Sequence, residues 1–287
     1  MQMNFDAVTI WIFAFFSFCL GACISSFLNV VIWRVPRGES ICHPPSHCPK
    51  CNSPIPWWCN VPILSWALLK GRCVKCKAPI PFRYILVELL GAALFLCAFW
   101  RYGTYAPFAW LWIALMIVGT FIDLDHQLLP DFVTVGGMVY GVVLSAAFWA
   151  LGAFTSVSLP DMTGHVFYVS PLKSVLGLAV GFGLLWFVRF IGSAAFKREA
   201  MGMGDVFLMG AVGAIFGVEA VVVSLVLSSL FGSLVGFSMI LLAKTRLGGF
   251  TAIPYGPFIC AGCLSWMFYG PEIWRWYANL LTGPRPF

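Results

Sequence analysis

Charge is scarce in this sequence. Only 10% of its 287 residues are Asp, Glu, Lys or Arg, whereas 61% are hydrophobic. A soluble domain of this length carries about a quarter charged residues, so the composition excludes an ordinary soluble protein. Long uncharged runs recur along the chain, and such runs are typical of segments that lie in lipid. The sequence therefore predicts an all-α polytopic membrane protein.

Hydrophilic stretches are also scarce. The first apolar run, residues 8–33, lacks a basic start and is too long for the apolar part of a signal peptide, so we expect a retained span. Runs of sufficient length predict about eight transmembrane helices. Their ranges are 8–33, 84–101, 107–123, 132–152, 172–192, 205–218, 220–243 and 252–270. We expect three parts: the first helix (1–33), a hydrophilic insert (34–83) and a membrane core (84–287).

Basic residues gather in a few connections and so orient the spans. Lys and Arg mark the cytosolic side of a membrane protein, which predicts a cytosolic insert and both termini outside. The net charge of +6 reflects this bias, and we expect no nucleic-acid partner. The basic residues of the three cytosolic connections are Arg34, Arg37, Lys50, Lys70, Arg72, Lys75, Lys77 and Arg83, then Lys197 and Arg198, then Lys244 and Arg246.

The insert contains two C-x2-C pairs, Cys48 with Cys51 and Cys73 with Cys76. Four thiolates at this spacing can form a tetrahedral zinc site, which would fold the insert rather than catalyse. Disulfides or a redox pair are the alternative, although a reducing cytosol disfavours disulfides. Other possible ligands nearby are Cys42, His43, His47 and Cys59. Buried packing is expected for the five cysteines inside predicted spans, Cys19, Cys23, Cys97, Cys260 and Cys263.

Carboxylates are rare, and a few of them fall at or inside the ends of predicted spans. A carboxylate is costly there, so these residues are functional candidates. They are Glu88, Asp123, Asp125, Asp131 and Asp205.

Two of these candidates meet in the predicted topology. The third span ends inside at Asp123 and the sixth begins inside at Asp205, so both reach the cytosolic edge. Facing carboxylates repel, so such a pair would share one proton near neutrality, which suits the activation of water against a peptide bond. Asp125 points about 200° away from Asp123 on a helix and lies nearer water, so Asp123 is the predicted partner. For Asp205 alone, a helix N-cap is the alternative.

Several motifs together resemble those of the type IV prepilin peptidases, bacterial membrane aspartyl proteases of the GxGD class. The resemblance covers nearly the whole chain. It rests on SFLNVVIWRVPRGES, CPKC, GRCVKC, RYILVELL, IDLDHQLLPD, GMGD and IPYGPF.

The resemblance implies a function and a site. Family members cleave the basic leader of type IV prepilins and type II secretion pseudopilins at the cytosolic face of the bacterial inner membrane. Many then methylate the new N-terminal residue, usually Phe, with S-adenosylmethionine. The catalytic pair falls on Asp123 and Asp205, and the zinc ligands fall on Cys48, Cys51, Cys73 and Cys76.

Two further residues, Gly71 and Glu88, resemble family positions that are linked to methyl transfer. Gly71 could instead serve a turn, and Glu88 could pair with Arg83 or Arg101.

Two other classes of protein are alternatives to a membrane protease. An ion-coupled transporter would show repeated halves, which the sequence lacks, and a zinc-bearing scaffold would leave the paired aspartates without a role.

Overall fold

The computed structural model describes residues 6–155, 169–197, 199, 201–242 and 253–282. The described chain is helical, with isolated β-bridges in the insert as its only extended pairing, which confirms the predicted all-α class. It divides into two compact units, Met1–Val118 and Gly119–Phe287. The sequence-based boundaries at residues 33 and 83 stay predictions.

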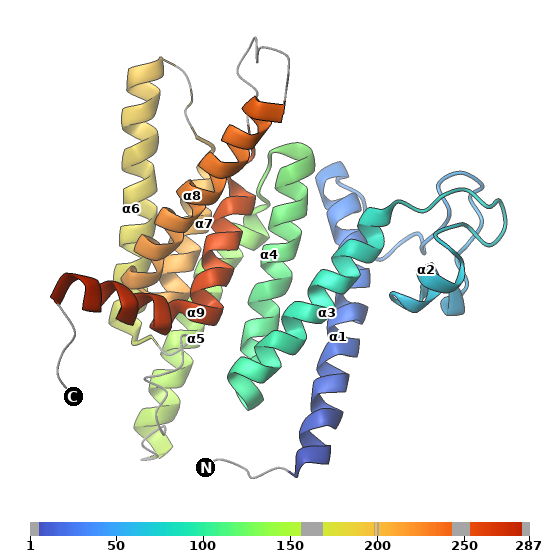
Figure 1. Ribbon diagram of the computed structural model, residues 1–287, viewed down its shortest axis with the longest axis horizontal. Coiled ribbons are helices and arrows are strands. Elements are labelled where there is room, and N and C mark those ends of the chain that lie inside the picture. Colours follow the sequence, from blue (N-terminus) through green and yellow to red (C-terminus); the bar gives the residue numbers. More distant parts are fainter. Residues whose placement is uncertain (1–5, 156–168, 198, 200, 243–252, 283–287) are drawn as a thin grey trace. The chain divides into compact units, whose positions relative to one another are not determined.

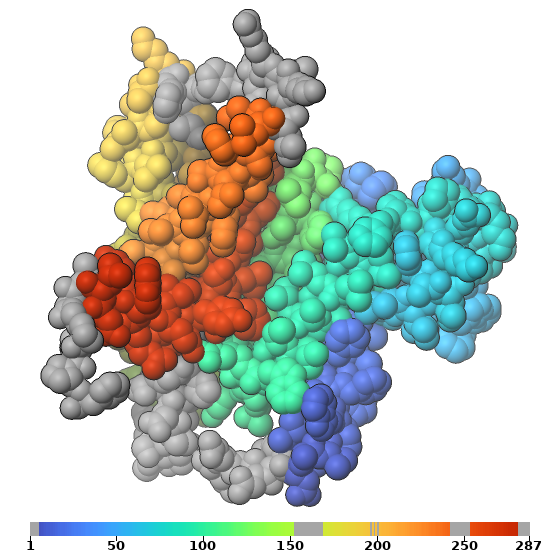
Figure 2. Space-filling view, in the orientation of Figure 1, coloured from blue at the N-terminus to red at the C-terminus, as the bar shows by residue number. Residues whose placement is uncertain are grey.

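The first unit is built on helices α1 (Ala7–Arg34) and α3 (Phe82–Tyr102), which run side by side in opposite directions (Figure 1). They approach closely at Gly21, where an added Cβ would lie 2.7 Å from the carbonyl oxygen of Gly91. The insert between them is a lobe beside this helix pair (Figure 2). Its short helices are η1 (Val35–Arg37), η2 (Trp57–Asn60) and α2 (Leu64–Leu68).

The helix α4 (Ala106–His126) follows η3 (Gly103–Tyr105) and passes from the first unit into the second. In its first part, Trp110 stacks on Phe95 of α3 with ring centroids 5.4 Å apart. The Nε1–H of Trp110 also donates to the Phe95 carbonyl over 3.0 Å.

The second unit is organised around α7 (Met203–Phe216), which packs on α5, α6, α8 and α9 (Figure 1). Nearly every residue of α7 from Asp205 onward is buried. A helix that is apolar all round belongs inside a bundle, and the sequence of α7 has this character. The surrounding helices are α5 (Asp131–Thr155), α6 (Pro171–Phe196), α8 (Val218–Leu242) and α9 (Gly256–Thr282).

The described helices support a multi-pass membrane protein, and each predicted span coincides with one helix. Within the described residues, five stretches are long and apolar enough to cross a membrane, so the predicted number of eight is not confirmed. The helix α7 has 14 residues and is about 21 Å long, which is shorter than a bilayer core of about 30 Å. The helix α9 continues through Pro271, beyond the predicted end at residue 270. The basic residues Arg198, Lys244 and Arg246 lie outside the described residues.

Close backbone packing fixes α7 against α6. A Cβ added at Gly177 of α6 would overlap the carbonyl oxygen of Gly213 of α7, and one added at Gly213 would overlap that of Gly177. Nearby, the Ser174 hydroxyl donates to the Ala214 carbonyl over 2.6 Å. The two helices can therefore touch only because both positions lack a side chain.

We expect Gly177→Ala to destabilise the protein by about 1–3 kcal/mol, because the added methyl group forces α6 and α7 apart. Gly183→Ala on the same helix is the matched control, since nothing lies within 4 Å of a Cβ added there. Alanine is more stable than glycine in the interior of a helix. The control should therefore unfold at the same temperature as the native protein or higher. The measurement is the thermal unfolding midpoint in detergent. Equal midpoints for both variants would contradict the close packing.

Candidate functional site

Asp123 lies in the last turn of α4, and its side chain is buried, with 5% exposure. Its Oδ2 accepts a hydrogen bond of 3.0 Å from the backbone N–H of Gly256, the first residue of α9. A helix N-terminus offers unsatisfied N–H groups and a positive dipole end, which together suit a carboxylate. Asp125 is exposed, as is Asp131. The burial of Asp123 agrees with the greater depth predicted for it.

Asp205 occupies the first turn of α7 and is also buried, with 8% exposure. Gly202 is the N-cap of this helix, and its backbone N–H donates to the Asp205 carboxylate. The carboxylate thus reaches back from the third helical position to the N-cap, as in a capping box. The alternative prediction that Asp205 is itself the N-cap is wrong.

The two buried carboxylates share one neighbourhood. Asp123 is close enough to Asp205 to act on it electrostatically, and both act on the thiol of Cys260. Cys260 lies one helical turn after Gly256, and its Sγ is hydrogen-bonded to the side chain of Thr120. The buried packing predicted for five cysteines is confirmed for Cys260 and Cys263, whereas Cys19 is half-buried and Cys23 and Cys97 are exposed. The position of Cys260 beside both carboxylates is new.

Leu129 packs between the segments that carry the carboxylates. A Cβ added at Gly204 would lie 2.9 Å from the Leu129 Cβ, and one added at Gly256 would lie 3.3 Å from its Cδ1. At Gly256 an added Cβ would also lie 2.7 Å from Asp123 Oδ2. These two glycines therefore allow Leu129 and the carboxylate to approach the backbones of α7 and α9.

The start of α9 is tied to α8 through Tyr255. Its hydroxyl is hydrogen-bonded to Ser228 Oγ at 2.8 Å and to Ser229 Oγ at 3.3 Å. Because Tyr255 directly precedes Gly256, these bonds also fix the position of the Gly256 N–H, which donates to the Asp123 carboxylate.

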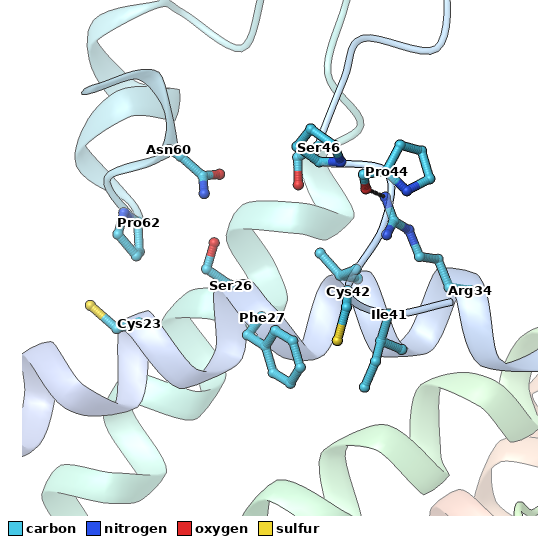
Figure 3. A pocket seen from close by; sticks show the side chains of 12 residues that line it. Cys23, Ser26, Phe27, Arg34, Ile41, Cys42, Pro44, Ser46, Asn60 and Pro62 are labelled. Carbon is cyan, nitrogen blue, oxygen red and sulfur yellow. Dashed lines mark hydrogen bonds between the residues drawn. The ribbon is translucent and has the colours of Figure 1, made fainter. Parts of the chain in front are cut away.

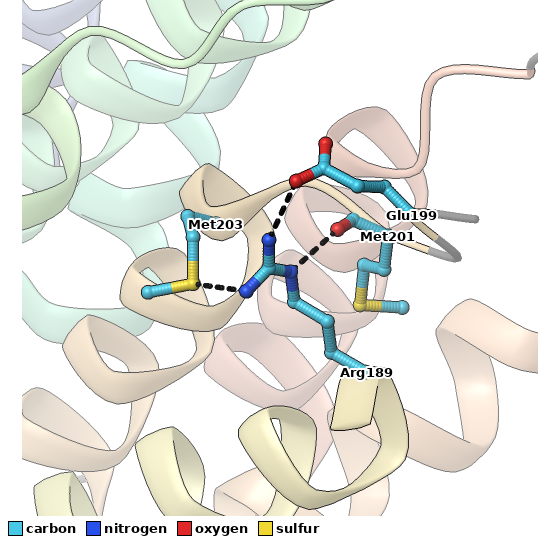
Figure 4. Close-up of polar contacts among 4 residues, drawn as sticks. All are labelled: Arg189, Glu199, Met201 and Met203. Carbon is cyan, nitrogen blue, oxygen red and sulfur yellow. Dashed lines mark hydrogen bonds and ion pairs between the residues drawn. The ribbon is translucent and has the colours of Figure 1, made fainter. Parts of the chain in front are cut away.

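The segment before α7 is held by Arg189 of α6 (Figure 4). Its Nε donates to the Met201 carbonyl over 2.9 Å, and one terminal nitrogen forms an ion pair of 3.1 Å with Glu199. Its other terminal nitrogen contacts the Met203 sulfur at 3.0 Å. One planar guanidinium thus fixes three residues just ahead of Asp205. Sequence reasoning missed Arg189, because nothing in the chain marks a contact between α6 and this segment.

The four paired cysteines come together in the first unit. The Sγ atoms of Cys48, Cys51, Cys73 and Cys76 all lie within 4.8 Å of one another, and the Cys48 and Cys76 sulfurs are 3.8 Å apart. Tetrahedral zinc with bonds of about 2.3 Å requires sulfurs about 3.8 Å apart, so the cluster fits this ion. All eleven cysteines are free, which disagrees with a disulfide pairing. The alternative ligands Cys42, His43, His47 and Cys59 are not part of the cluster.

The two C-x2-C pairs have the same backbone geometry. The N–H of Cys48 donates to the Ser53 carbonyl, and that of Cys73 donates to the Ala78 carbonyl in the equivalent way. In each pair the residue after the second cysteine has a positive φ, 50° at Asn52 and 59° at Lys77. The cluster is thus built from two copies of one tight turn.

Hydrogen bonds prepare part of this cluster to bind a cation. The hydroxyl and the backbone N–H of Ser53 lower the pKa of Cys51 to about 6. Backbone N–H groups of Cys76 and Lys75 lower the pKa of Cys73. The N–H of Ala78 bonds the sulfur of Cys76, but desolvation and the three neighbouring sulfurs raise its pKa to about 11. Thiolates are the ligands that zinc binds, so metal uptake would release the protons that remain.

Gly71 and Glu88 lie in the first unit as supports of the insert. Gly71 has φ +64° and lies against the ring of Trp66, which fits the alternative that it serves a turn. The buried Glu88 carboxylate accepts a hydrogen bond of 2.7 Å from the backbone N–H of Ile63, which also has a positive φ. The structure thus gives Glu88 a backbone partner that the sequence did not indicate.

The fold and these clusters define a class: an all-α multi-pass membrane protein with two buried aspartates in one unit and four gathered cysteines in the other. Two family models match the chain. Residues 19–102 match the bacterial peptidase A24 N-terminal domain, and residues 110–237 match the type IV leader peptidase family. Both aspartates lie in the second match, and all four cysteines lie in the first.

Similar proteins agree with these matches. The prepilin leader peptidase/N-methyltransferase of Myxococcus xanthus is 40% identical over 83% of this chain, which spans 66% of that relative. The protein of the same name from Aeromonas hydrophila is 36% identical over 93% of this chain and 94% of its own length. The type 4 prepilin-like proteins leader peptide-processing enzyme of Escherichia coli is 36% identical over 86% of this chain and 91% of its own length. No solved structure matches the chain. The chain belongs to the type IV leader peptidase family.

We expect Arg189→Gln to loosen the start of α7, because a neutral amide cannot replace the three contacts of the guanidinium. Loss of a hydrogen bond to a charged group corresponds to about a tenfold increase in local opening. The measurement is hydrogen–deuterium exchange of the peptide that covers residues 201–206. Arg275→Gln is the control, since the Arg275 Nε bonds the Pro271 carbonyl within α9 and, among the described residues, does not reach the start of α7. Native exchange rates in Arg189→Gln would show that this contact does not hold α7.

Proposed function

We propose that this chain removes the leader peptides of type IV prepilins and type II secretion pseudopilins and then N-methylates the new N-terminal residue, usually Phe. S-adenosylmethionine is the proposed methyl donor. Membership of the leader peptidase family and the names of the relatives support both activities. The burial of Asp123 beside Asp205 is the observation that supports hydrolysis most directly.

The carboxylate pair suits general acid–base catalysis. One carboxylate takes a proton from a bound water as the water oxygen attacks the carbonyl carbon of the scissile peptide. The partner, in its protonated form, gives its proton to the carbonyl oxygen, which yields a tetrahedral diol. The C–N bond then breaks as the first carboxyl gives its proton to the leaving nitrogen, and the partner takes a proton back from the diol, so the pair again holds one shared proton. The N–H of Gly256, at the start of α9, holds the Asp123 carboxylate, and the N–H of Gly202, at the start of α7, holds that of Asp205.

The orientation of the chain follows from its basic residues. The stretch 34–83 carries eight Lys and Arg residues, which favours the cytosolic side. Two further crossings, by α3 and then α4, return the chain to that side at Asp123. The proposed site therefore faces the cytosol at the inner membrane, where a basic leader lies, while the apolar helix of the pilin stays in the lipid.

Zinc is the proposed resident metal of the first unit. The residues that would hold it are Cys48, Cys51, Cys73 and Cys76, whose sulfur spacing fits a tetrahedral ion. Four thiolates leave no position for water, so the metal supplies stability to the insert and takes no part in hydrolysis. The insert has few regular secondary-structure elements, and a segment of this kind depends on a metal site for its stability.

We expect Asp123→Asn and Asp205→Asn each to lower the rate of leader cleavage by roughly 10²- to 10⁴-fold, because an amide can neither accept nor donate the transferred proton. The assay uses purified protein in detergent with a prepilin substrate, and follows leader removal separately from transfer of a labelled methyl group. A pre-cleaved pilin tests the second activity independently of the first.

Asp125→Asn is the matched comparison, because this aspartate is exposed and two residues from Asp123. It should cleave at close to the native rate. If both buried-aspartate variants cleaved normally while folded, the proposed pair would be wrong. If only Asp125→Asn lost activity, the catalytic assignment would move to Asp125.

We expect native protein to contain one zinc ion per chain and Cys48→Ser to lose it, because removal of one thiolate opens the tetrahedral site. Cys59→Ser is the matched control within the insert, since Cys59 lies outside the cluster. The measurement is metal content after gel filtration, with limited proteolysis of the insert as a second readout. Equal zinc content in the two variants would contradict the four-cysteine assignment.

A further inference from the structure

A cavity of about 350 Å³ lies between α1 and the insert (Figure 3). One wall is the cytosolic half of α1, which contributes Ser26, Phe27 and Arg34, and the other is formed by two segments of the insert, residues 41–46 and 60–62. Ligand sites in proteins begin at about 300 Å³, so the cavity can hold a small molecule. All of its lining residues fall within residues 19–102, the match to the N-terminal domain model, and outside the peptidase match.

The cavity contains a buried cation without a carboxylate partner. Arg34 is 7% exposed. Its two terminal nitrogens donate to the carbonyls of Ser40 at 2.9 Å and Pro44 at 2.7 Å, and among the described residues no carboxylate lies within ion-pair distance of it. A guanidinium has five N–H donors, so two carbonyls leave some of them free. A buried charge is costly when it is unpaired, which points to an anionic group on whatever fills the cavity.

The other lining residues are complementary to a ligand that has a flat apolar part and further polar groups. Phe27 and the proline rings of Pro44 and Pro62 offer apolar faces, while Ser26 and Asn60 offer a hydroxyl and an amide (Figure 3). S-adenosylmethionine combines a carboxylate, a purine ring, ribose hydroxyls and a sulfonium cation. An aromatic ring attracts a cation of this kind.

We propose that the methyl donor binds in this cavity, with its carboxylate on Arg34 and its purine against the apolar wall. This inference rests on the proposed methyltransferase activity and gives it a site. In the reaction, the amine lone pair of the new pilin N-terminus forms a bond to the methyl carbon as the carbon–sulfur bond breaks. The electron pair of that bond stays on sulfur, which becomes a neutral thioether, and the methylated amine loses one proton to solvent.

The cavity also gives the two predicted methyl-transfer residues a supporting role. Neither Gly71 nor Glu88 lines it. The Glu88 carboxylate holds the N–H of Ile63, and Ile63 directly follows Pro62 in the cavity wall. Gly71 lies against Trp66, in the short helix that begins one residue after Ile63. Both residues therefore act as positioning residues for this wall.

The test measures binding of S-adenosylhomocysteine, the unreactive product, to the purified full-length protein by isothermal titration calorimetry. Ser26→Phe fills the cavity from α1, and Arg34→Gln removes the cation. We expect each to weaken binding by about 10- to 100-fold. Arg34→Gln loses a hydrogen bond to a charged group, and Ser26→Phe occupies the volume that the ligand needs. Methyl transfer to a pre-cleaved pilin should fall in parallel. Leader cleavage by the same samples reports that the membrane core is folded.

Ser233→Phe is the matched control, because Ser233 is exposed on α8 in the other unit. It should bind S-adenosylhomocysteine as the native protein does. Native binding and transfer in Ser26→Phe would overturn the cavity assignment and leave the proposed activity standing. If native protein cleaved leaders but neither bound S-adenosylhomocysteine nor transferred methyl groups, the second activity itself would be refuted. If titration with anionic lipid headgroups depended on Arg34 while S-adenosylhomocysteine binding did not, the cavity would be a lipid site.

Discussion

The buried carboxylate pair is the constraint on which the second unit depends. Taking a carboxylate out of water costs several kcal/mol unless hydrogen-bond donors replace the solvent. Asp123 receives the Gly256 N–H from the start of α9, and Asp205 receives the Gly202 N–H at the start of α7. Two helices must therefore begin where α4 ends.

Packing against Leu129 explains why glycine occupies position 204 in the GMGD motif and position 256 in the IPYGPF motif. Gly204 and Gly256 are neighbours of the same leucine, and a side chain at either position would displace it. The conformational freedom of glycine is not what these positions need, since neither has a positive φ. They need the absence of a Cβ, which lets the motif around Asp123 lie directly against both helix starts.

Much of this arrangement could be predicted from local sequence. Apolar runs located the eight long helices, two C-x2-C spacings located the cysteine cluster, and depth on a helix distinguished Asp123 from Asp125. The rest depends on contacts that no local pattern encodes. Arg189 bonds residues that follow it by 10 to 14 positions, Gly256 lies 133 residues from Asp123, and Glu88 bonds a backbone N–H 25 residues earlier. The predicted number of eight spans stays unconfirmed, because a run of apolar residues such as α7 does not reveal whether its helix is surrounded by protein or by lipid.

The insert shows how a segment with little regular structure acquires a defined shape. Its helices are too short to bury a core of their own, so separate ties must fix it. One is the cysteine cluster, which joins its two tight turns. A second is Glu88, which reaches it from α3, and a third is Arg34, which reaches it from α1 through the carbonyls of Ser40 and Pro44. The latter two are buried charges that hold backbone groups. Arg34 lines the cavity, and Glu88 holds Ile63, the residue that follows Pro62 in the cavity wall. Because Arg34 and Glu88 each hold backbone groups in or next to the cavity wall, the position of that wall is what these two ties jointly determine.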